Sequence, residues 1–559
     1  MASAYCLFRN RTCPCYQDAF CASLRIVPQA DLAAMANHRP APDPVCALLL
    51  HPNDNVVVAL RRLPAGQGWT GSPGIVRALQ EILPAHKMAI RHIPSGAPIL
   101  KYGHPIGIAL EAIQTGQHVH THNMKMPDAP PRLPTLNPTE SSLSEVSGSS
   151  QPPRCFQGYA RADGRVGTRN YLAIVPSVHC SVSVSSLIAD RFDPRALARE
   201  FPHVDGILAL RHNSGCGLTS GDPLRQLQRT LAGLAHHPNI AGCLFIGLGC
   251  EVNQADALAR LAGTTSSPGA ASFGVPPHLN IQNLGGVRKT VEAGVAAVRR
   301  LLPLAEACHR TPQPLGKLVV ALKCGGSDAW SGITANPALG VAVDKLVSQG
   351  GTAVLAETPE IFGAEHLLIH RAAQPEIASA LLERIAWWTE HLREFGASVD
   401  NNPSPGNKEG GLTTIYEKSL GAVAKAGLSP LRAVYRYAEP VRELGLCFMD
   451  TPGFDPVSMT GLIAGGCNLS VFTTGRGSVF GGKPVPCLKV ASNTELFDRM
   501  SGDLDLNAGT ILAGLETVAQ VGNRIFEQII ATASGQQTRA EIAGLGNDDF
   551  VPWVLGPVL

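Results

Sequence analysis

The sequence predicts an α/β protein in which a small β-rich module precedes a much larger βα body. Between residues 45 and 124, short apolar runs alternate with frequent Gly and Pro, which is typical of short strands joined by turns. Residues 125–153 are rich in Pro and Ser and nearly free of large apolar side chains after Leu143, so they are expected to form a linker. From residue 154 onward, strand-length apolar runs repeatedly end in polar, Gly-rich clusters and are often followed by a helical pattern. This rhythm predicts a mostly parallel sheet in the body.

The N-terminal segment, residues 1–44, contains Cys6, Cys13, Cys15 and Cys21. No C-x-x-C pair with a matching partner pair occurs there, so a zinc knuckle is not favoured, and the segment is an extension without an assigned role. The sequence shows no apolar export signal and no run of about 18 apolar residues. We therefore expect a cytoplasmic protein that does not span a membrane and whose cysteines are mostly reduced.

The overall composition excludes several classes of partner. A hydrophobic fraction of 45% and a charged fraction of 16% are typical of compact globular proteins. The formal net charge of +2 leaves no basic surplus for nucleic acid or an anionic membrane. Neither polyanion is therefore an expected partner.

Two features of the N-terminal module bear on structure and metal binding. Residues 47–60 read as two short strands around an Asn/Asp turn. His118, His120 and His122 alternate, which on a strand places them on one face at a spacing suitable for a metal. Because the sequence specifies no further ligand, a solvated strand end is the preferred interpretation.

Polar clusters follow six strand-length apolar runs of the body. Ligands of open α/β sheets bind outside the carboxyl ends of the strands, so these clusters are candidate sites. Any one of them could be explained as a turn or a helix cap, but six together favour a site. The clusters are residues 211–217, 247–251, 323–328, 357–360, 450–453 and 473–477.

Side chains able to bind a borderline divalent ion are concentrated in these clusters and at His51, although their spacings form no local metal motif. The candidates are His51, His212, Cys216, Cys250, Glu251, Cys324, Asp328, Glu357 and Glu360. Alternatively, Cys180, Cys216, Cys250 and Cys324 could hold an iron–sulfur cluster, since each follows an apolar run and has polar or Gly neighbours. Cys243, within an apolar strand, is interpreted as a buried hydrophobe.

Two cationic side chains have the chemistry to bind a carboxylate. Arg476 lies in the Gly-flanked loop 473–477, and Lys408 lies in the Pro- and Gly-rich loop 402–411. The sequence has no G-x-G-x-x-G, no G-x-x-x-x-G-K-[ST] and no G-x-S-x-G at the required strand-to-helix turn, which disfavours nicotinamide, nucleotide and serine-hydrolase chemistry.

From about Val45 to the C-terminus the sequence resembles the altronate and galactarate dehydratases and their sulfolactate sulfo-lyase relatives. The blocks that carry the resemblance are residues 101–107 (KYGHPIG), 164–170 (GRVGTRN), 246–251 (IGLGCE), 324–337 (CGGSDAWSGITANP), 402–408 (NPSPGNK) and 472–477 (FTTGRG). The resemblance implies a small β-clip module of the SAF type at 45–124, a linker at 125–153, a first dehydratase domain at 154–310 and a C-terminal Rossmann-like domain at 311–559.

The resemblance also implies removal of water from a polyhydroxylated carboxylate to give a 2-keto-3-deoxy acid. Altronate-type aldonates are the first choice of substrate and galactarate-type aldarates the second. Ferrous iron is the implied metal, with Mn²⁺ as an alternative and an iron–sulfur cluster left open. The alternatives are a sulfo-lyase or other C–X lyase on the same scaffold, and a non-catalytic sugar-acid sensor. The oligomeric state is open, a homo-oligomer included.

The dehydration chemistry requires a base, an acid and a cationic or metal clamp, because a proton α to a carboxylate is very weakly acidic. On the matched positions we expect three groups of residues. The catalytic residues are Asp328, His212, Glu251 and Lys408; the substrate contacts are Arg476, Thr474, Asn407 and Ser327; and the metal ligands are Cys250, Cys324, Cys216 and His51. The sequence departs from the family pattern at Pro52, beside His51, where a polar residue is more usual.

Overall fold

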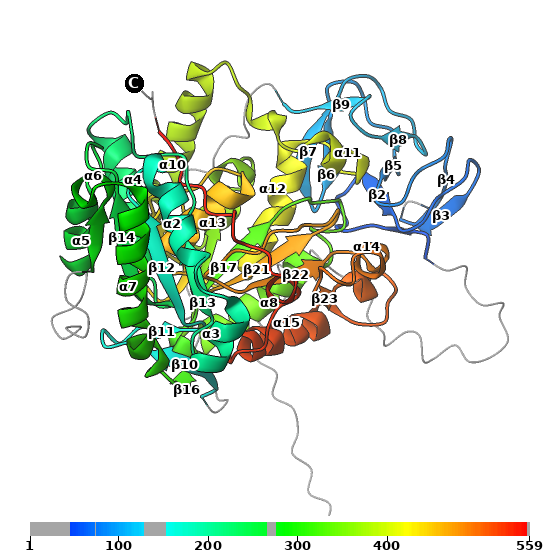
Figure 1. Ribbon diagram of the computed structural model, residues 1–559. Coiled ribbons are helices and arrows are strands. Elements are labelled where there is room, and N and C mark those ends of the chain that lie inside the picture. Colours follow the sequence, from blue (N-terminus) through cyan, green and yellow to red (C-terminus); the bar gives the residue numbers. More distant parts are fainter. Residues whose placement is uncertain (1–44, 73, 128–152, 265–275, 556–559) are drawn as a thin grey trace, which may run out of the picture. The chain divides into compact units, whose positions relative to one another are not determined.

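The computed structural model describes residues 45–72, 74–127, 153–264 and 276–555 (Figure 1). The chain divides into two compact units, Met1–Asp128 and Ala129–Leu559. The expected extension 1–44 and residues 128–152 of the expected linker lie outside the described residues. No helix in the described part of the chain is long and apolar enough to cross a membrane.

The N-terminal unit is built from short strands, as the sequence predicts, and its described residues contain no helix. A four-stranded antiparallel sheet has the order β1-β2-β5-β8, and a three-stranded sheet the order β6-β7-β9. Val57, Met88 and Ile82 lie in the core of this unit. The strands are β1 (Ala47–Leu48), β2 (Val56–Ala59), β3 (Gly68–Gly71), β4 (Gly74–Arg77), β5 (Lys87–Ala89), β6 (Pro98–Lys101), β7 (His104–Ala109), β8 (His118–Val119) and β9 (Met124–Lys125).

The first part of the second unit contains a four-stranded parallel sheet in the order β13-β12-β14-β15. Helices cover both faces, so the central strand has an uninterrupted apolar sequence, YLAIVP, rather than an alternating one. The strands are β12 (Tyr171–Pro176), β13 (Gly206–Ala209), β14 (Ile240–Gly247) and β15 (His278–Asn280). The helices are α2 (Val182–Ala189), α3 (Pro194–Glu200), α4 (Asp222–Ala235), α5 (Ala255–Thr264), α6 (Ile281–Leu284) and α7 (Val287–Glu306).

The second part is built on a seven-stranded sheet in the order β19-β20-β18-β17-β21-β22-β23, with every neighbouring pair parallel. The strands are β17 (Val319–Cys324), β18 (Thr352–Ala356), β19 (Leu431–Tyr435), β20 (Gly445–Met449), β21 (Leu469–Thr474), β22 (Cys487–Ala491) and β23 (Leu506–Asn507). The helices are α8 (Ala335–Ser348), α9 (His366–Ile369), α10 (Pro375–Glu394), α11 (Pro405–Glu409), α12 (Ile415–Val423), α13 (Asp455–Ala464), α14 (Thr494–Arg499), α15 (Val518–Ala533) and α16 (Arg539–Ile542). The predicted α/β class, with a β-rich N-terminal module and a parallel sheet in the body, is confirmed.

A shared core joins the two sheets of the body. One hydrophobic cluster includes Phe245 of the smaller sheet, Val354 of the larger sheet and Leu462 of α13. Helices α4 and α13 meet at Gly233, where an added Cβ would lie 2.3 Å from the carbonyl oxygen of Ala464. Glycine is therefore needed at this contact, because any side chain would push the helices apart.

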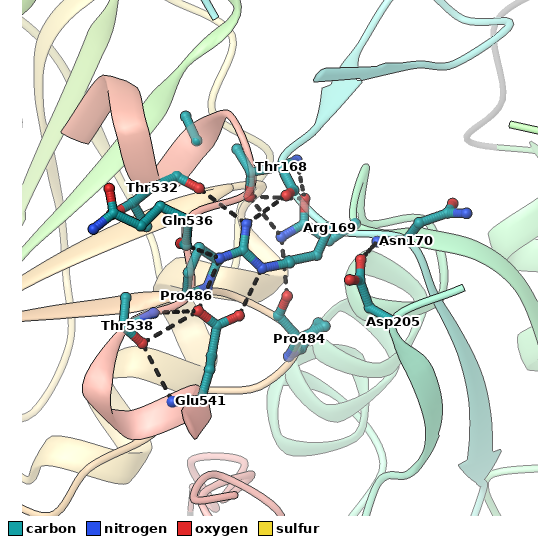
Figure 2. Close-up of polar contacts among 12 residues, drawn as sticks. Thr168, Arg169, Asn170, Asp205, Pro484, Pro486, Thr532, Gln536, Thr538 and Glu541 are labelled. Carbon is teal, nitrogen blue, oxygen red and sulfur yellow. Dashed lines mark hydrogen bonds and ion pairs between the residues drawn. The ribbon is translucent and has the colours of Figure 1, made fainter. Parts of the chain in front are cut away.

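The block GRVGTRN has a structural role in this junction (Figure 2). Its residues Val166–Gly167 form β11, which belongs to a small antiparallel sheet with β10 (Cys155–Ala160) and β16 (Arg310–Pro314). Arg169 donates to both carboxylate oxygens of Glu541 in α16, at 2.6 and 2.8 Å. Its remaining N–H groups donate to the carbonyls of Thr168, Thr532 and Gln536. This buried arginine therefore ties the start of β12 to the C-terminal helices.

Candidate active site

A thiol and two carboxylates meet at the carboxyl end of the larger sheet. Cys324 ends β17, Glu357 directly follows the parallel neighbour β18, and Glu360 ends the next short helical turn, Thr358–Glu360. One ligand-type atom of each side chain lies within 4.8 Å of the other two, and all three side chains are buried. Glu357 has a φ of +73°, a left-handed conformation that costs energy for a residue with a Cβ and is found preferentially at functional sites.

Two lysines from one helical segment point at this grouping. Lys418 lies in α12 and Lys425 in the helical turn Ala424–Ala426 that continues it; residues seven apart share a helix face. The Lys425 ammonium lies 2.7 Å from Cys324 Sγ, and the Lys418 ammonium lies 2.6 Å from Glu360 Oε1. The Asn402 side chain bridges the second pair, because it donates to Glu360 at 2.9 Å and accepts from Lys418 at 2.8 Å.

A third lysine, Lys323, is fully buried at the end of β17. Its ammonium donates to Glu357 Oε1 and lies 2.8 Å from Asp455 at the start of α13. The side chain of Asp455 is 33% exposed, whereas that of Lys323 is completely buried. We refer to the seven side chains as the buried charge cluster; they are Lys323, Lys418, Lys425, Glu357, Glu360, Asp455 and Cys324. Asp455 is the member through which the cluster reaches solvent.

The two glutamates of the cluster have opposite pKa shifts. Burial raises the pKa of Glu357, and the charge of Glu360 raises it further against the opposing effect of Lys323 and Lys425. Burial acts on Glu360 in the same direction, but the ammonium of Lys418, with those of Lys323 and Lys425, holds the pKa of Glu360 below its ordinary value. Glu357 is therefore the carboxyl group best suited to exchange a proton near neutral pH. Its Oε2 atom accepts no hydrogen bond and lies 3.6 Å from the ammonium of Lys425.

The donor set of Cys324, Glu357 and Glu360 matches the ligand types of a borderline divalent ion. Each of the three side chains, however, is already paired with a lysine ammonium. A divalent ion placed between them would lie among three like charges in a buried site. The cluster as arranged does not fit the ferrous-iron site that the resemblance implies, and lysines supply its positive charge.

Asp328 holds three loops together. Its two oxygens accept hydrogen bonds from the backbone and hydroxyl of Ser331, at 2.8 Å each, and from Ser492 and Asn493 at 2.9–3.0 Å. A Cβ on Gly475 would lie 2.1 Å from the Asp328 carboxylate carbon, so only glycine fits there. With its acceptor positions engaged in this way, Asp328 positions the loops after β17, β21 and β22.

Two of the four expected substrate contacts, Asn407 and Thr474, also make hydrogen bonds within these loops. Asn407 donates to the Ser327 carbonyl at 2.8 Å and accepts from Ser404, and the Thr474 hydroxyl accepts from the Gly477 N–H at 3.0 Å. The Ser327 hydroxyl, in contrast, is buried and has no hydrogen-bond partner. Among the four, it is the polar group inside the protein that remains available to a ligand.

Two cations lie at the accessible side of these loops. The Arg476 side chain is 45% exposed and pairs with Glu409 at 3.2 Å, a contact that solvent weakens. Lys408, in α11, is half-buried and its ammonium forms no hydrogen bond or ion pair with any described residue. Their role in binding a carboxylate stays a prediction.

His212 and Glu251 lie at the carboxyl edge of the smaller sheet. His212 Nε2 donates to the Pro176 carbonyl at 2.8 Å, and burial lowers the pKa of His212 to about 4, so the ring is neutral. Glu251 accepts from the Ser177 hydroxyl at 2.7 Å and from the N–H groups of Leu248 and Gly249. These bonds stabilise the loop after β14 and occupy both carboxylate oxygens.

Three of the expected metal ligands, Cys216, Cys250 and Cys324, are not brought together. Cys216 and Cys250 have exposed thiols that follow β13 and β14, whereas Cys324 is buried at the end of β17 in the other sheet. None of the groupings of three metal-binding side chains found among the described residues contains Cys216, Cys250 or His51. His51 lies in a turn of the N-terminal unit, where its backbone N–H donates to Asp54 at 3.0 Å. Similar positions after apolar runs thus belong to strands of two different sheets, which the sequence does not reveal.

The three lysines of the cluster are not among the site residues expected from the sequence. Lys323 stands beside Cys324 in an otherwise apolar strand, an unusual position for a solvated side chain, and this was an available signal. Lys418 and Lys425 sit seven residues apart in a segment rich in Ala and Gly, which is a weaker signal. Asp455 occupies the first turn of α13 and has the appearance of an ordinary N-terminal helix residue.

A β-rich unit followed by a two-sheet body, with buried acids and bases at strand ends, defines a multidomain α/β enzyme. Family models match three stretches of the chain. They are the SAF domain of altronate/galactarate dehydratase at 46–127, the second domain of D-galactarate dehydratase/altronate hydrolase at 158–306, and the C-terminal domain of D-galactarate/altronate dehydratase at 315–558.

Three similar proteins carry curated names. An altronate dehydratase of Bacillus subtilis is 36% identical over 88% of this chain and 96% of its own length. A galactarate dehydratase (L-threo-forming) of Escherichia coli is 37% identical over 89% of this chain and 95% of its own. The beta subunit of a (2R)-sulfolactate sulfo-lyase of Chromohalobacter salexigens is 32% identical over 71% of this chain and 97% of its own. The chain therefore belongs to the D-galactarate/altronate dehydratase family, and the expected resemblance is confirmed.

Proposed function

We propose that this protein is a hydro-lyase that removes water from a sugar acid of the altronate or galactarate type, giving a 2-keto-3-deoxy acid. The relatives named altronate dehydratase and galactarate dehydratase match across both units of the chain. The structural observation that carries the proposal is the buried charge cluster, in which the ammonium groups of Lys323 and Lys425 flank the carboxyl group of Glu357.

The cluster has the parts that such an elimination needs. A base must remove the weakly acidic proton next to the substrate carboxylate, cations must stabilise the negative charge that develops, and an acid must protonate the departing hydroxyl group. In the proposed roles, Glu357 Oε2 takes the proton, because this atom accepts no hydrogen bond and burial raises the pKa of Glu357. Lys425, whose ammonium lies 3.6 Å from that atom, is the proposed proton donor.

The loops around the cluster supply the proposed substrate contacts. Arg476 and Lys408 hold the carboxylate at the accessible side, and the unpaired Ser327 hydroxyl binds a hydroxyl group of the sugar acid. Asp328 fixes the positions of these loops through its hydrogen bonds. Asp328 is thus a positioning residue in this proposal.

Dehydration is preferred over sulfo-lyase chemistry because the dehydratase relatives match this chain as single chains, whereas the sulfo-lyase matches it as two subunits. The dehydratase relatives match the SAF unit and the body within one chain. The sulfo-lyase matches as two separate subunits, the beta subunit over 71% of this chain and the alpha subunit over 14%. The arrangement of this chain is that of the dehydratases.

The test offers altronate, galactarate and sulfolactate separately to the purified full-length protein under anaerobic conditions with Fe²⁺. We expect a 2-keto-3-deoxy acid from altronate or galactarate and no sulfite from sulfolactate. Chelation followed by addition of Fe²⁺ or Mn²⁺ tests the expected metal requirement. Sulfite formation would overturn the dehydratase proposal, and so would a thermal shift with sugar acids without product.

A pair of variants tests the role of the cluster. Glu357→Gln should lower kcat by at least about 100-fold, the usual contribution of a general base. Glu383→Gln, on the exposed side of α10, is the matched control and should leave kcat unchanged. Equal activity of the two variants would refute the assignment of Glu357.

A further inference from the structure

The N-terminal unit contains a second grouping of metal-binding side chains, formed by His86, His118 and His120. One ring nitrogen of each lies within 4.8 Å of those of the other two. The ring centroids are 5.1 Å apart for His86 and His118, 4.7 Å for His86 and His120, and 5.6 Å for His118 and His120. We call this grouping the histidine triad.

Strand pairing brings the triad together. Antiparallel β5 and β8 pair Met88 with His118, which places His86, just before β5, beside the end of β8. The sequence suggested His118, His120 and His122 on one strand face, but β8 ends at Val119 and the chain then turns. His86 is therefore the third member of the triad, and His122 is exposed and lies outside it.

Hydrogen bonds hold the backbone of the triad in place. The fully buried Asn123 side chain donates to the His118 carbonyl at 2.8 Å and accepts from the His120 N–H at 3.0 Å. The His86 N–H donates to the Leu83 carbonyl at 3.1 Å, and the His86 carbonyl accepts from the Ala59 N–H at 2.9 Å. These bonds fix the backbone from which the three imidazole rings project.

Two ring nitrogens of the triad are close enough to bind the same ion. His86 Nδ1 and His118 Nε2 face each other at 3.0 Å, the arrangement of two nitrogens that share one proton or one cation.

We propose that His86, His118 and His120 bind one divalent transition-metal ion, of the class of Zn²⁺ or Fe²⁺, through one nitrogen each. Three imidazole nitrogens suit these ions, and three protein ligands leave a coordination position open for water or an oxygen ligand. The site stands on the N-terminal unit alone and does not depend on the proposed dehydration.

The test measures metal binding by the full-length protein without reference to activity. Protein stripped with a chelator is loaded with Zn²⁺, and X-ray absorption at the zinc edge reports the ligands. We expect about one tightly bound ion per chain, with nitrogen or oxygen neighbours at about 2.0–2.1 Å. A shell of sulfur neighbours at about 2.3 Å would show that the ion is held by cysteines, and would overturn the proposal.

Substitutions test the individual ligands. His118→Ala and His86→Ala should each lose the bound ion, whereas His92→Ala should retain it, because His92 is exposed in the same unit and outside the triad. Circular dichroism and the unfolding midpoint show whether each variant is folded. A folded His118→Ala variant that still binds Zn²⁺ as tightly as the wild type would refute the proposed site. If that variant does not fold, the X-ray absorption spectrum of the wild type decides whether nitrogen or sulfur atoms bind the ion.

Discussion

Removal of the Arg169 side chain should destabilise the body more than removal of any exposed arginine. Arg169 and Glu541 form a two-pronged ion pair with side chains that are only 3% and 9% exposed. Arg169→Ala leaves the Glu541 carboxylate buried without its cation, a loss of about 3–5 kcal/mol in comparable pairs. The Thr532 and Gln536 carbonyls also lose a donor.

Two compensations keep the expected loss within that range. Glu541 still accepts from the N–H and hydroxyl of Thr538, at 2.9 and 3.2 Å. The Thr168 carbonyl still accepts from Arg310 at 2.9 Å. We therefore expect the free energy of unfolding to fall by about 4 kcal/mol in Arg169→Ala.

Urea-induced unfolding followed by circular dichroism measures this loss. Arg211→Ala is the matched control, because Arg211 pairs with Asp548 on the surface with side chains 45% and 76% exposed. The control should lose no more than about 1 kcal/mol. The double variant Arg169→Ala with Glu541→Leu should lose less than the sum of the two single variants, since it leaves no unpaired buried charge. If Arg169→Ala is no less stable than Arg211→Ala, the junction does not depend on this ion pair.

Three further predictions concern single buried side chains. Asp328→Asn places amide hydrogens against the donors of Ser331, Ser492 and Asn493. We expect kcat to fall about 100-fold while the protein stays folded, because the loops that contact the substrate shift. A kcat within twofold of the wild-type value would contradict this prediction. Cys243→Ala should lower the free energy of unfolding by about 1–3 kcal/mol and leave kcat unchanged, because the side chain is buried in the core of the smaller sheet. Unfolding and steady-state assays measure the two quantities. Equal loss of activity in Cys243→Ala and Asp328→Asn would contradict the roles assigned to both residues. His212 has a pKa of about 4 in the folded state against about 6.5 unfolded, so the unfolded chain binds the extra proton and stability falls as the pH drops from about 6.5 to about 4, by up to roughly 3 kcal/mol. In His212→Gln that part of the acid sensitivity should disappear from the unfolding midpoints, and an unchanged pH dependence would argue against it.

Patterns within short segments predicted much of the fold. The apolar runs that became β14, β17 and β18 indicated strands of a mostly parallel sheet, and the polar residues after β17 and β18 indicated the sheet edge where Cys324 and Glu357 lie. The Pro- and Ser-rich stretch indicated the separation between the two units. These features depend on neighbouring residues alone, and local sequence is sufficient to reveal them.

Which residues come together in each site depends on contacts between segments that are far apart in the sequence. Lys425 and Cys324 are 101 residues apart, and their pairing follows from the packing of the α12 segment over the ends of β17 and β18. No spacing rule relates the two positions, so Lys418 and Lys425 could not be chosen from the other lysines of the chain.

The sequence by itself determined which segments become strands, which residues stand at strand ends, and which family the chain resembles, because strand propensity, turn chemistry and motif order are local properties. Only the tertiary structure decided that Cys216 and Cys250 belong to one sheet and Cys324 to another, and that His86 rather than His122 completes the histidine triad. Strand order and strand pairing set these neighbours, and both are decided by how whole elements pack together to bury their apolar faces.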